Sequence, residues 1–163
     1  MRRIVAARGA GDIVYVDESG FEPHPYRPSG WGRRGQKVYG DRWGKRGGRT
    51  NLIAARRGKT FLAPVLFEGT ADTALVNYWF ETQLLPVLRV QSTVIWDNAP
   101  FHNKADLRAI AAASTHQVLF LPPYSPDFNK IEHDFALIKK LRLSHPPDTP
   151  IDDIIKMYTC YSE

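Results

Sequence analysis

The spacing of apolar residues changes near Asp72, and this change constrains the fold more than any other feature of the sequence. Before Asp72, short apolar stretches alternate with turn residues, a pattern typical of β-strands. After it, apolar residues recur at helical spacing, with two short apolar runs between the helical segments. A chain that begins with several strands and continues with alternating helices and strands is expected to form a mixed sheet with helices packed on it.

The predicted fold class is therefore α/β, with an antiparallel meander first and parallel strands following. Strands are predicted at 12–17, 36–39, 50–56, 59–67, 92–97 and 117–121. Helices are predicted from Asp72 to about Pro86 and over 104–113, 130–143 and 151–161. Proline cannot donate a backbone hydrogen bond to a neighbouring strand, so Pro64 indicates that the strand at 59–67 is interrupted or lies at a sheet edge.

Length and composition are those of one ordinary domain. The 163 residues, 43% of them hydrophobic and 24% charged, can bury a single core. No apolar run approaches the roughly 20 residues that cross a bilayer, and the N-terminal apolar stretch is too short for a signal peptide. The single cysteine, Cys160, argues against a disulfide framework or a cysteine zinc site. A reducing, intracellular location is therefore expected.

Positive charge is concentrated between Arg27 and Lys59. This segment holds eleven of the 22 Lys and Arg residues and a single acid, so it carries +10 in a chain whose net charge is +5. Interleaved aromatic residues favour contact with a polyanion, although a solvated, glycine-rich basic loop is an alternative interpretation. Without amphipathic helical spacing, the segment does not favour binding to a membrane surface. The candidate DNA-binding residues are Arg33, Arg34, Lys37, Arg42, Lys45, Arg46 and Arg49.

Three acidic residues stand where a metal-dependent site requires them. Asp17 and Asp97 each follow an apolar strand, and Glu132 lies at the start of a predicted helix. Carboxylates are ligands of hard cations such as Mg²⁺, and two such ions can activate an attacking oxygen and stabilise a leaving one. Asp17 and Asp97 can share a site only if their strands are parallel neighbours. Taken singly, each acid could instead cap a turn or favour a helix dipole.

Further polar residues lie close to these acids in the sequence. Asn98 and His102 follow Asp97, and His133 follows Glu132, so these three are candidate auxiliary groups near the site. A lone histidine is more often a packed or surface residue. Because side chains alternate along a strand, we expect Glu18 on the opposite face from its neighbour Asp17, in solvent.

Four motifs in this order resemble those of a protein family. They are YVDESGF at 15–21, GWG at 30–32 with GQ at 35–36, WDNAPFH at 96–102, and LPPYSPDFN at 121–129 with IEH at 131–133. The sequence resembles a DDE transposase, and is most similar to the bacterial insertion-sequence branch, the IS630 type, of the Tc1/mariner superfamily. Thirty-four residues separate Asp97 from Glu132, which is the spacing of that branch. The resemblance covers about residues 12–160.

The resemblance implies an RNase H-like catalytic domain at 12–163, preceded by an N-terminal remnant at 1–11. It implies a triad of Asp17, Asp97 and Glu132 that binds two Mg²⁺ or Mn²⁺ ions. The implied reaction is hydrolysis of DNA at transposon ends, followed by attack of the freed 3′-OH on target DNA at a TA dinucleotide.

The resemblance also implies partners and a location. The partners are DNA, as transposon ends and as target, and a second copy in an active dimer. The family's N-terminal helix-turn-helix part is expected to be missing or encoded separately. The expected location is the prokaryotic cytoplasm, in association with the nucleoid.

Two alternative functions stay open. One is a catalytically inactive DNA-binding remnant, which would bind DNA in a salt-sensitive, sequence-indifferent way without cleaving it. The other is a general RNase H-like nuclease acting on RNA–DNA hybrids or Holliday junctions, because the same three carboxylates could serve that chemistry.

Overall fold

The computed structural model describes residues 13–22, 34, 48–88, 91–122 and 129–161. The expected strand at 36–39 and the N-terminal segment 1–11 lie outside the described residues. The same holds for five candidate DNA-binding residues, which are Arg33, Lys37, Arg42, Lys45 and Arg46.

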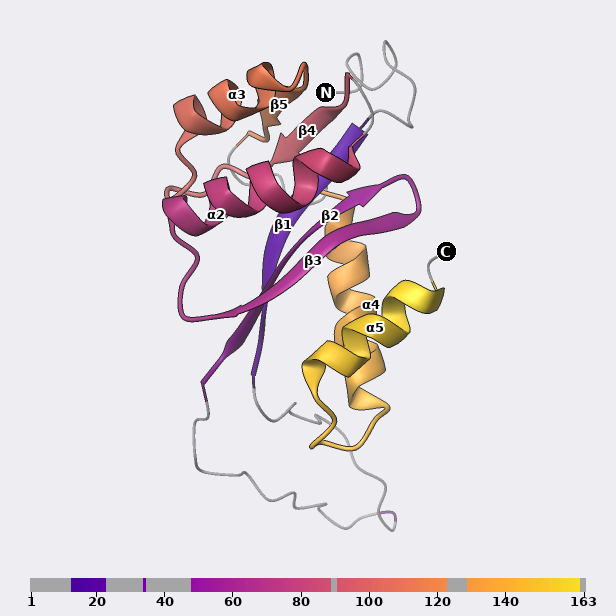
Figure 1. Ribbon diagram of the computed structural model, residues 1–163. Coiled ribbons are helices and arrows are strands. Elements are labelled where there is room, and N and C mark those ends of the chain that lie inside the picture. Colours follow the sequence, from indigo (N-terminus) through magenta and orange to yellow (C-terminus); the bar gives the residue numbers. More distant parts are fainter. Residues whose placement is uncertain (1–12, 23–33, 35–47, 89–90, 123–128, 162–163) are drawn as a thin grey trace.

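Within the described ranges, five strands form one mixed sheet in the order β3-β2-β1-β4-β5 (Figure 1). The strands are β1 (Ile13–Phe21), β2 (Thr50–Arg57), β3 (Thr60–Glu68), β4 (Thr93–Trp96) and β5 (Gln117–Phe120). The first three form an antiparallel meander, and β4 and β5 run parallel to β1. The strand that contains Pro64 lies at the sheet edge, as predicted.

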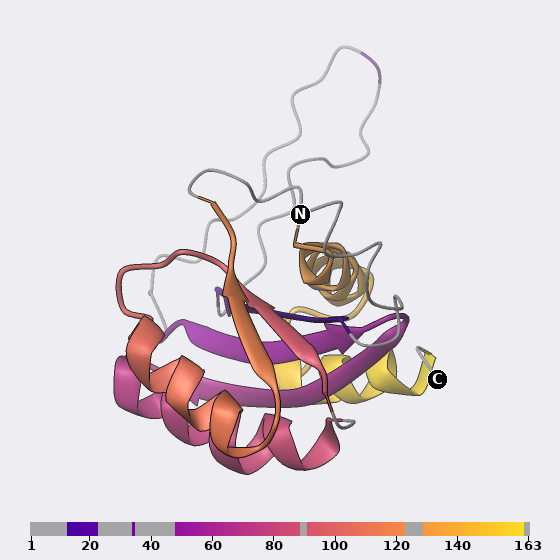
Figure 2. The same ribbon diagram turned by 90° about the horizontal axis from the view of Figure 1, so that it is seen from above.

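Helices cover both faces of this sheet (Figures 1 and 2). They are α2 (Thr73–Trp79), which continues through a π-helical turn (Phe80–Leu84) and a 3₁₀ turn (Leu85–Val87), α3 (Lys104–Ala113), α4 (Ile131–Leu143) and α5 (Ile151–Tyr161). The sequence offers Thr70 or Asp72 as the N-cap of α2, and it is Asp72 whose carboxylate accepts a hydrogen bond of 2.8 Å from the Leu75 N–H. No described helix combines the length and the apolar character needed to cross a membrane.

The alternating side chains of β1 separate two hydrophobic cores. Ile13 and Tyr15 face α4 and α5, whereas Val14 and Val16 face α2 and α3. On the second face, Trp96 packs edge-on against aromatic side chains of the helical segment that begins with α2, with ring centroids 5.7 and 6.1 Å away. This packing holds β4, and with it the residues that follow, in a fixed position.

Most element bounds agree with the sequence predictions. The structure has helices at 104–113 and 151–161, as expected. The main difference is β1, predicted to end at Asp17, which continues to Phe21 because its second half pairs with Thr50–Ile53 of β2. A mixed sheet with helices on both faces is the RNase H-like arrangement implied by the resemblance.

Candidate active site

The register of β1 against β4 places Asp17 and Asp97 at the same level of the sheet. Parallel pairing joins Ile13 with Thr93 and Tyr15 with Ile95, and each acid follows two residues later on its own chain segment. The two segments are therefore parallel neighbours, as the shared site requires. Because β4 stops at Trp96 while β1 continues, Asp97 leaves the sheet beside the middle of β1 and not beside its end.

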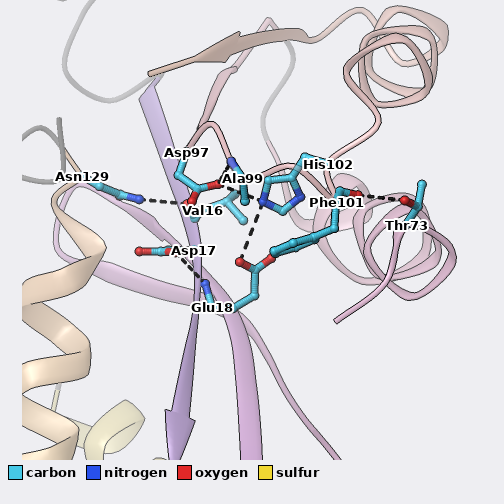
Figure 3. A network of polar contacts seen from close by, with 9 residues as sticks. All are labelled: Val16, Asp17, Glu18, Thr73, Asp97, Ala99, Phe101, His102 and Asn129. Atoms are coloured by element: carbon cyan, nitrogen blue, oxygen red, sulfur yellow. Dashed lines mark hydrogen bonds and ion pairs between the residues drawn. The ribbon is translucent and has the colours of Figure 1, made fainter. Parts of the chain in front are cut away.

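Glu132 reaches the same region from α4. This helix packs on the β1 side of the sheet through its buried apolar residues Ile131, Phe135 and Ile138. Just before the helix, the Asn129 side chain donates a buried hydrogen bond of 3.0 Å from Nδ2 to the Val16 carbonyl (Figure 3). This bond fixes the start of α4 next to Asp17. Glu132 is exposed, and it lies close enough to Asp17 for its charge to raise the pKa of that carboxyl.

The acids of β1 resist ionisation. Burial raises the pKa of Asp17 to about 7, and the charges of Asp97 and Glu132 contribute, against a hydrogen bond from the Glu18 N–H and the positive charge of Lys139. Burial also raises the pKa of Glu18 to about 8, together with the charges of Asp17 and Asp97. Burial is thus the main reason that these two acids resist ionisation, and the negative charges of neighbouring acids add to it.

Asp97 is more readily ionised than these two acids. Burial on its own would raise its pKa, but hydrogen bonds from His102 and from the Ala99 N–H hold the pKa below its ordinary value. The Ala99 N–H lies 3.1 Å from Asp97 Oδ1, and His102 Nε2 lies 2.9 Å from the same oxygen (Figure 3). The loop after β4 therefore presents Asp97 as a carboxylate of defined orientation.

Glu18 lies on the opposite face of β1 from Asp17, as expected, but the prediction that it is solvated is wrong. Its side chain is only 14% exposed, and Oε2 lies 3.8 Å from His102 Nε2. Oε1 is buried and has no hydrogen-bond partner among the described residues. The loop after β4 covers this face and brings Phe101 and His102 over it, which strand alternation alone could not reveal (Figure 3).

The remaining candidate residues lie around these acids or on the nearby surface. Asn98 is half-buried directly after Asp97, and His133 is exposed beside Glu132. Arg34 and Arg49 are the candidate DNA-binding residues within the described ranges, and both are exposed. Arg49 lies against β1 at Gly20, where an added Cβ would come within 1.8 Å of its Nε, so glycine leaves the space that this side chain occupies.

Sequence reasoning missed Lys139, which lies on the Asp17 side of the sheet. Its Nζ stands 5.7 Å from the ring centroid of Phe21, and its charge lowers the pKa of Asp17. Lys139 follows Glu132 by seven residues, or about two helical turns, so the two side chains lie on nearly the same side of α4. The seven-residue spacing from Glu132 could therefore have identified Lys139 from the sequence.

The donor chemistry fits a divalent cation, although the acids are not already assembled around one. Within the described ranges, no group of three or more His, Cys, Asp or Glu side chains is arranged to hold a metal ion. Carboxylate oxygens are nevertheless the preferred ligands of Mg²⁺ and Mn²⁺. A bound cation would also favour the ionised form of acids whose pKa is raised, such as Asp17.

We expect the free energy of unfolding without divalent cations to fall as the pH rises from about 5 to above 8. Asp17 and Glu18 have pKa values of about 7 and about 8 in the folded chain, against ordinary values of 3.8 and 4.5. The folded state therefore binds more protons in this window, so its stabilisation is complete at low pH and is lost as the pH passes through the folded values. A loss of about 2–4 kcal/mol is expected, since one pKa unit is worth about 1.4 kcal/mol and the two acids are coupled.

Urea denaturation in EDTA across this pH range measures the effect. The Glu18→Gln variant serves as the comparison, because its slope should be shallower while every other titrating group is retained. Millimolar Mg²⁺ should stabilise the parent most at high pH, where the carboxylates are ionised. Parent and variant curves of equal slope in EDTA would contradict this description of the site.

Comparison with known proteins agrees with this geometry. One protein family, described as DDE superfamily endonuclease, matches residues 12–151. The Mos1 transposase paired-end complex with left transposon end shares 20% identity with this chain, at a TM-score of 0.67 over 86% of this chain and 45% of that chain. The Mos1 mariner paired-end complex with Mn shares 18% identity, at a TM-score of 0.71 over 98% of this chain and 50% of that chain.

The catalytic domain of Mos1 mariner transposase is also similar, with 15% identity and a TM-score of 0.63 over 98% of this chain and 75% of that chain. No significant match is found among curated proteins. The chain thus spans about half the length of the chains in the paired-end complexes. These likenesses confirm the RNase H-like fold.

Proposed function

Since this chain belongs to the DDE superfamily of endonucleases, we propose that it is a transposase catalytic domain of the Tc1/mariner type. It cuts DNA at transposon ends and joins the freed 3′-OH to target DNA. The observation that carries this proposal is the parallel register of β1 and β4, which brings Asp17 beside Asp97 while Glu132 approaches from α4. Insertion at a TA dinucleotide is the finer part of the proposal.

Asp17, Asp97 and Glu132 are the proposed ligands of two Mg²⁺ or Mn²⁺ ions. Mos1 complexes of similar fold contain Mn and Mg. When bound, such ions activate the attacking oxygen and stabilise charge on the leaving oxygen. The protein orients the Asp97 carboxylate through hydrogen bonds from His102 and the Ala99 N–H, and Glu132 is exposed and so can turn toward Asp17. Asn98 and His133 are proposed as auxiliary groups beside these ligands.

The proposed reaction consists of two phosphoryl transfers. In the first, a water oxygen bonds to phosphorus while the P–O3′ bond breaks, and the departing oxygen becomes a 3′-OH. In the second, this 3′ oxygen bonds to a phosphorus of target DNA while the target's own 3′ oxygen leaves, so the number of phosphodiester bonds is unchanged. Neither step needs a covalent protein nucleophile, which agrees with a site built of carboxylates.

Basic residues at the edge of the site are proposed to contact DNA phosphates. Lys139 stands beside Asp17, and Arg49 lies against β1 at Gly20. Such contacts position the backbone and carry most of the sequence-independent affinity. The other proposed DNA-binding residues are Arg33, Arg34, Lys37, Arg42, Lys45 and Arg46.

The assembly is part of the proposal. Joining two transposon ends to one target requires more than one active site, so the active complex is proposed to be a dimer. The Mos1 chains in the paired-end complexes are about twice as long as the part matched here. We therefore assign recognition of transposon ends to a helix-turn-helix part outside these 163 residues.

Nicking of a supercoiled plasmid tests the proposed activity. We expect nicking with Mg²⁺ or Mn²⁺, none in EDTA, and a product with a free 3′-OH that a polymerase can extend. The same preparation should be given an RNA–DNA hybrid and a Holliday junction. Preferred cleavage of either would support a general RNase H-like nuclease, and salt-sensitive DNA binding without any cleavage would support an inactive remnant.

A further inference from the structure

We propose that His102 is the positioning residue of Asp97, and that Glu18 supports it as a second hydrogen-bond acceptor for the same ring nitrogen. The proposal rests on the proposed function, because it concerns how Asp97 is presented to a cation. Its structural basis is a series of polar contacts that crosses the end of β4, from the partly exposed Asp97 through the buried His102 to Glu18 (Figure 3). In this series of contacts, the His102 ring lies between the carboxyl groups of Asp97 and Glu18.

The distances identify the acceptor that the ring uses in this conformation. The His102 side chain is 0% exposed, and Nε2 lies 2.9 Å from Asp97 Oδ1 but 3.8 Å from Glu18 Oε2. The shorter contact makes Asp97 the nearer partner of Nε2, although neither carboxylate meets full hydrogen-bond geometry with this nitrogen. Nδ1 is buried with no hydrogen-bond partner among the described residues. Nε2 is therefore the ring nitrogen from which His102 can donate to either carboxylate.

Packing fixes the ring in place. Its centroid lies 4.9 Å from that of Trp96 and 4.3 Å from that of Phe101. The carbonyl of Phe101 accepts a hydrogen bond of 2.8 Å from the Thr73 hydroxyl, which ties the loop to the start of α2. A rigid donor beneath a carboxylate sets the orientation of that carboxylate, as outer partners of metal ligands commonly do.

The position of Glu18 follows from the same geometry. When Asp97 turns toward a cation, the Nε2–H of His102 loses its nearer partner, and a buried donor without a partner is unfavourable. Glu18 Oε2 is the second carboxylate oxygen near that nitrogen, and its partner oxygen Oε1 is buried without a hydrogen bond among the described residues. With Glu18 as the alternative acceptor, Asp97 can change its orientation while the ring remains hydrogen-bonded.

The test measures Mn²⁺ binding to the full chain by electron paramagnetic resonance of free Mn²⁺, together with the Mn²⁺ concentration that half-saturates nicking. His102→Leu removes the donor and should weaken Mn²⁺ affinity about 10- to 100-fold, the usual effect of losing an outer partner of a metal ligand. His102→Gln, whose amide can donate to Asp97, should recover most of that loss. Glu18→Leu removes the alternative acceptor and should weaken affinity by a smaller factor, about threefold to tenfold, whereas the amide oxygen of Glu18→Gln can still accept and should recover part of that loss.

The matched control is His116→Gln. His116 is likewise a buried histidine, but it lies just before β5, at the end of the sheet opposite the acids. Its replacement should leave Mn²⁺ affinity unchanged even if the melting temperature falls. If the His102 variants lost Mn²⁺ affinity only because the fold was less stable, His116→Gln would lose affinity as well. If they lost it because Asp97 was no longer positioned, His116→Gln would bind Mn²⁺ as the parent does.

The outcomes separate this proposal from the proposed function. If the parent binds no Mn²⁺, both are overturned. If the parent binds Mn²⁺ and folded His102→Leu binds it equally well, only the positioning role is overturned. The same conclusion follows if His102→Gln is no better than His102→Leu, or if the control loses as much affinity. Should His102→Leu fail to fold, Glu18→Leu and His102→Gln are compared with the control. Parent-like affinity in Glu18→Leu overturns the role of Glu18.

Discussion

Replacing Asp97 with Asn is expected to lower the rate of metal-dependent DNA cleavage at least about 10³-fold while the protein stays folded. The amide oxygen can still accept hydrogen bonds from His102 and the Ala99 N–H, so the loop after β4 keeps its partners. The lost negative charge removes a cation ligand, and such ions contribute several kcal/mol of transition-state stabilisation. About 4 kcal/mol corresponds to a factor of about 10³ in rate.

Single-turnover nicking in Mg²⁺ or Mn²⁺ measures this loss, with circular dichroism to verify the fold. Asp17→Asn and Glu132→Gln should show losses of the same order, because the three acids act as one unit. Asp152→Asn, which changes an exposed acid on α5, is the control and should cleave at nearly the parent rate. A triad variant that keeps a tenth or more of the parent activity would remove that residue from the proposed site.

Replacing Asp134 with Ala is expected to lower the free energy of unfolding by about 3 kcal/mol, near the lower end of the range for breaking a buried ion pair. Asp134 is 2% exposed, and its Oδ2 lies 2.6 Å from Arg56 Nη1. Its Oδ1 accepts a hydrogen bond from the Tyr158 hydroxyl, whose pKa is raised by burial and by this bond. The network joins α4 to β2 and α5. Its loss leaves the Arg56 guanidinium without its carboxylate partner.

Urea denaturation of Asp134→Ala and of Asp153→Ala gives the comparison. Asp153 pairs with Lys156 on the exposed surface of α5, at 3.7 Å, and exposed pairs contribute about 0–1 kcal/mol. Equal losses in the two variants would show that the buried network does not stabilise the fold. Because α4 also carries Glu132, Asp134→Ala should reduce cleavage at temperatures close to its own melting transition.

The fold was predictable from the sequence where local patterns determine structure. The change of period near Asp72 separated the meander from the helix-strand units, and the predicted bounds of α3 and α5 agree with the structure. The prediction that Asp17 and Asp97 follow strands that are parallel neighbours was also correct. Its basis was that these two acids can share a site only in that arrangement.

The details that depend on distant contacts were not predictable in this way. The second half of β1 is a strand because β2 pairs with it, not because of its own residues. Asn129 holds the start of α4 through a bond to Val16, 113 residues earlier in the chain. Glu18 is covered because a loop some eighty residues later folds over it, so its burial has no local signal.

The most direct test of the central claim is the anomalous scattering of Mn²⁺ in crystals of this chain. We predict anomalous difference peaks for Mn²⁺ ions coordinated by the carboxylates of Asp17, Asp97 and Glu132, with Glu132 turned toward the other two acids. These peaks should be absent from Asp97→Asn crystals prepared in the same way. A parent crystal at saturating Mn²⁺ with no peak at these three acids, or with Mn²⁺ held elsewhere, would contradict the account.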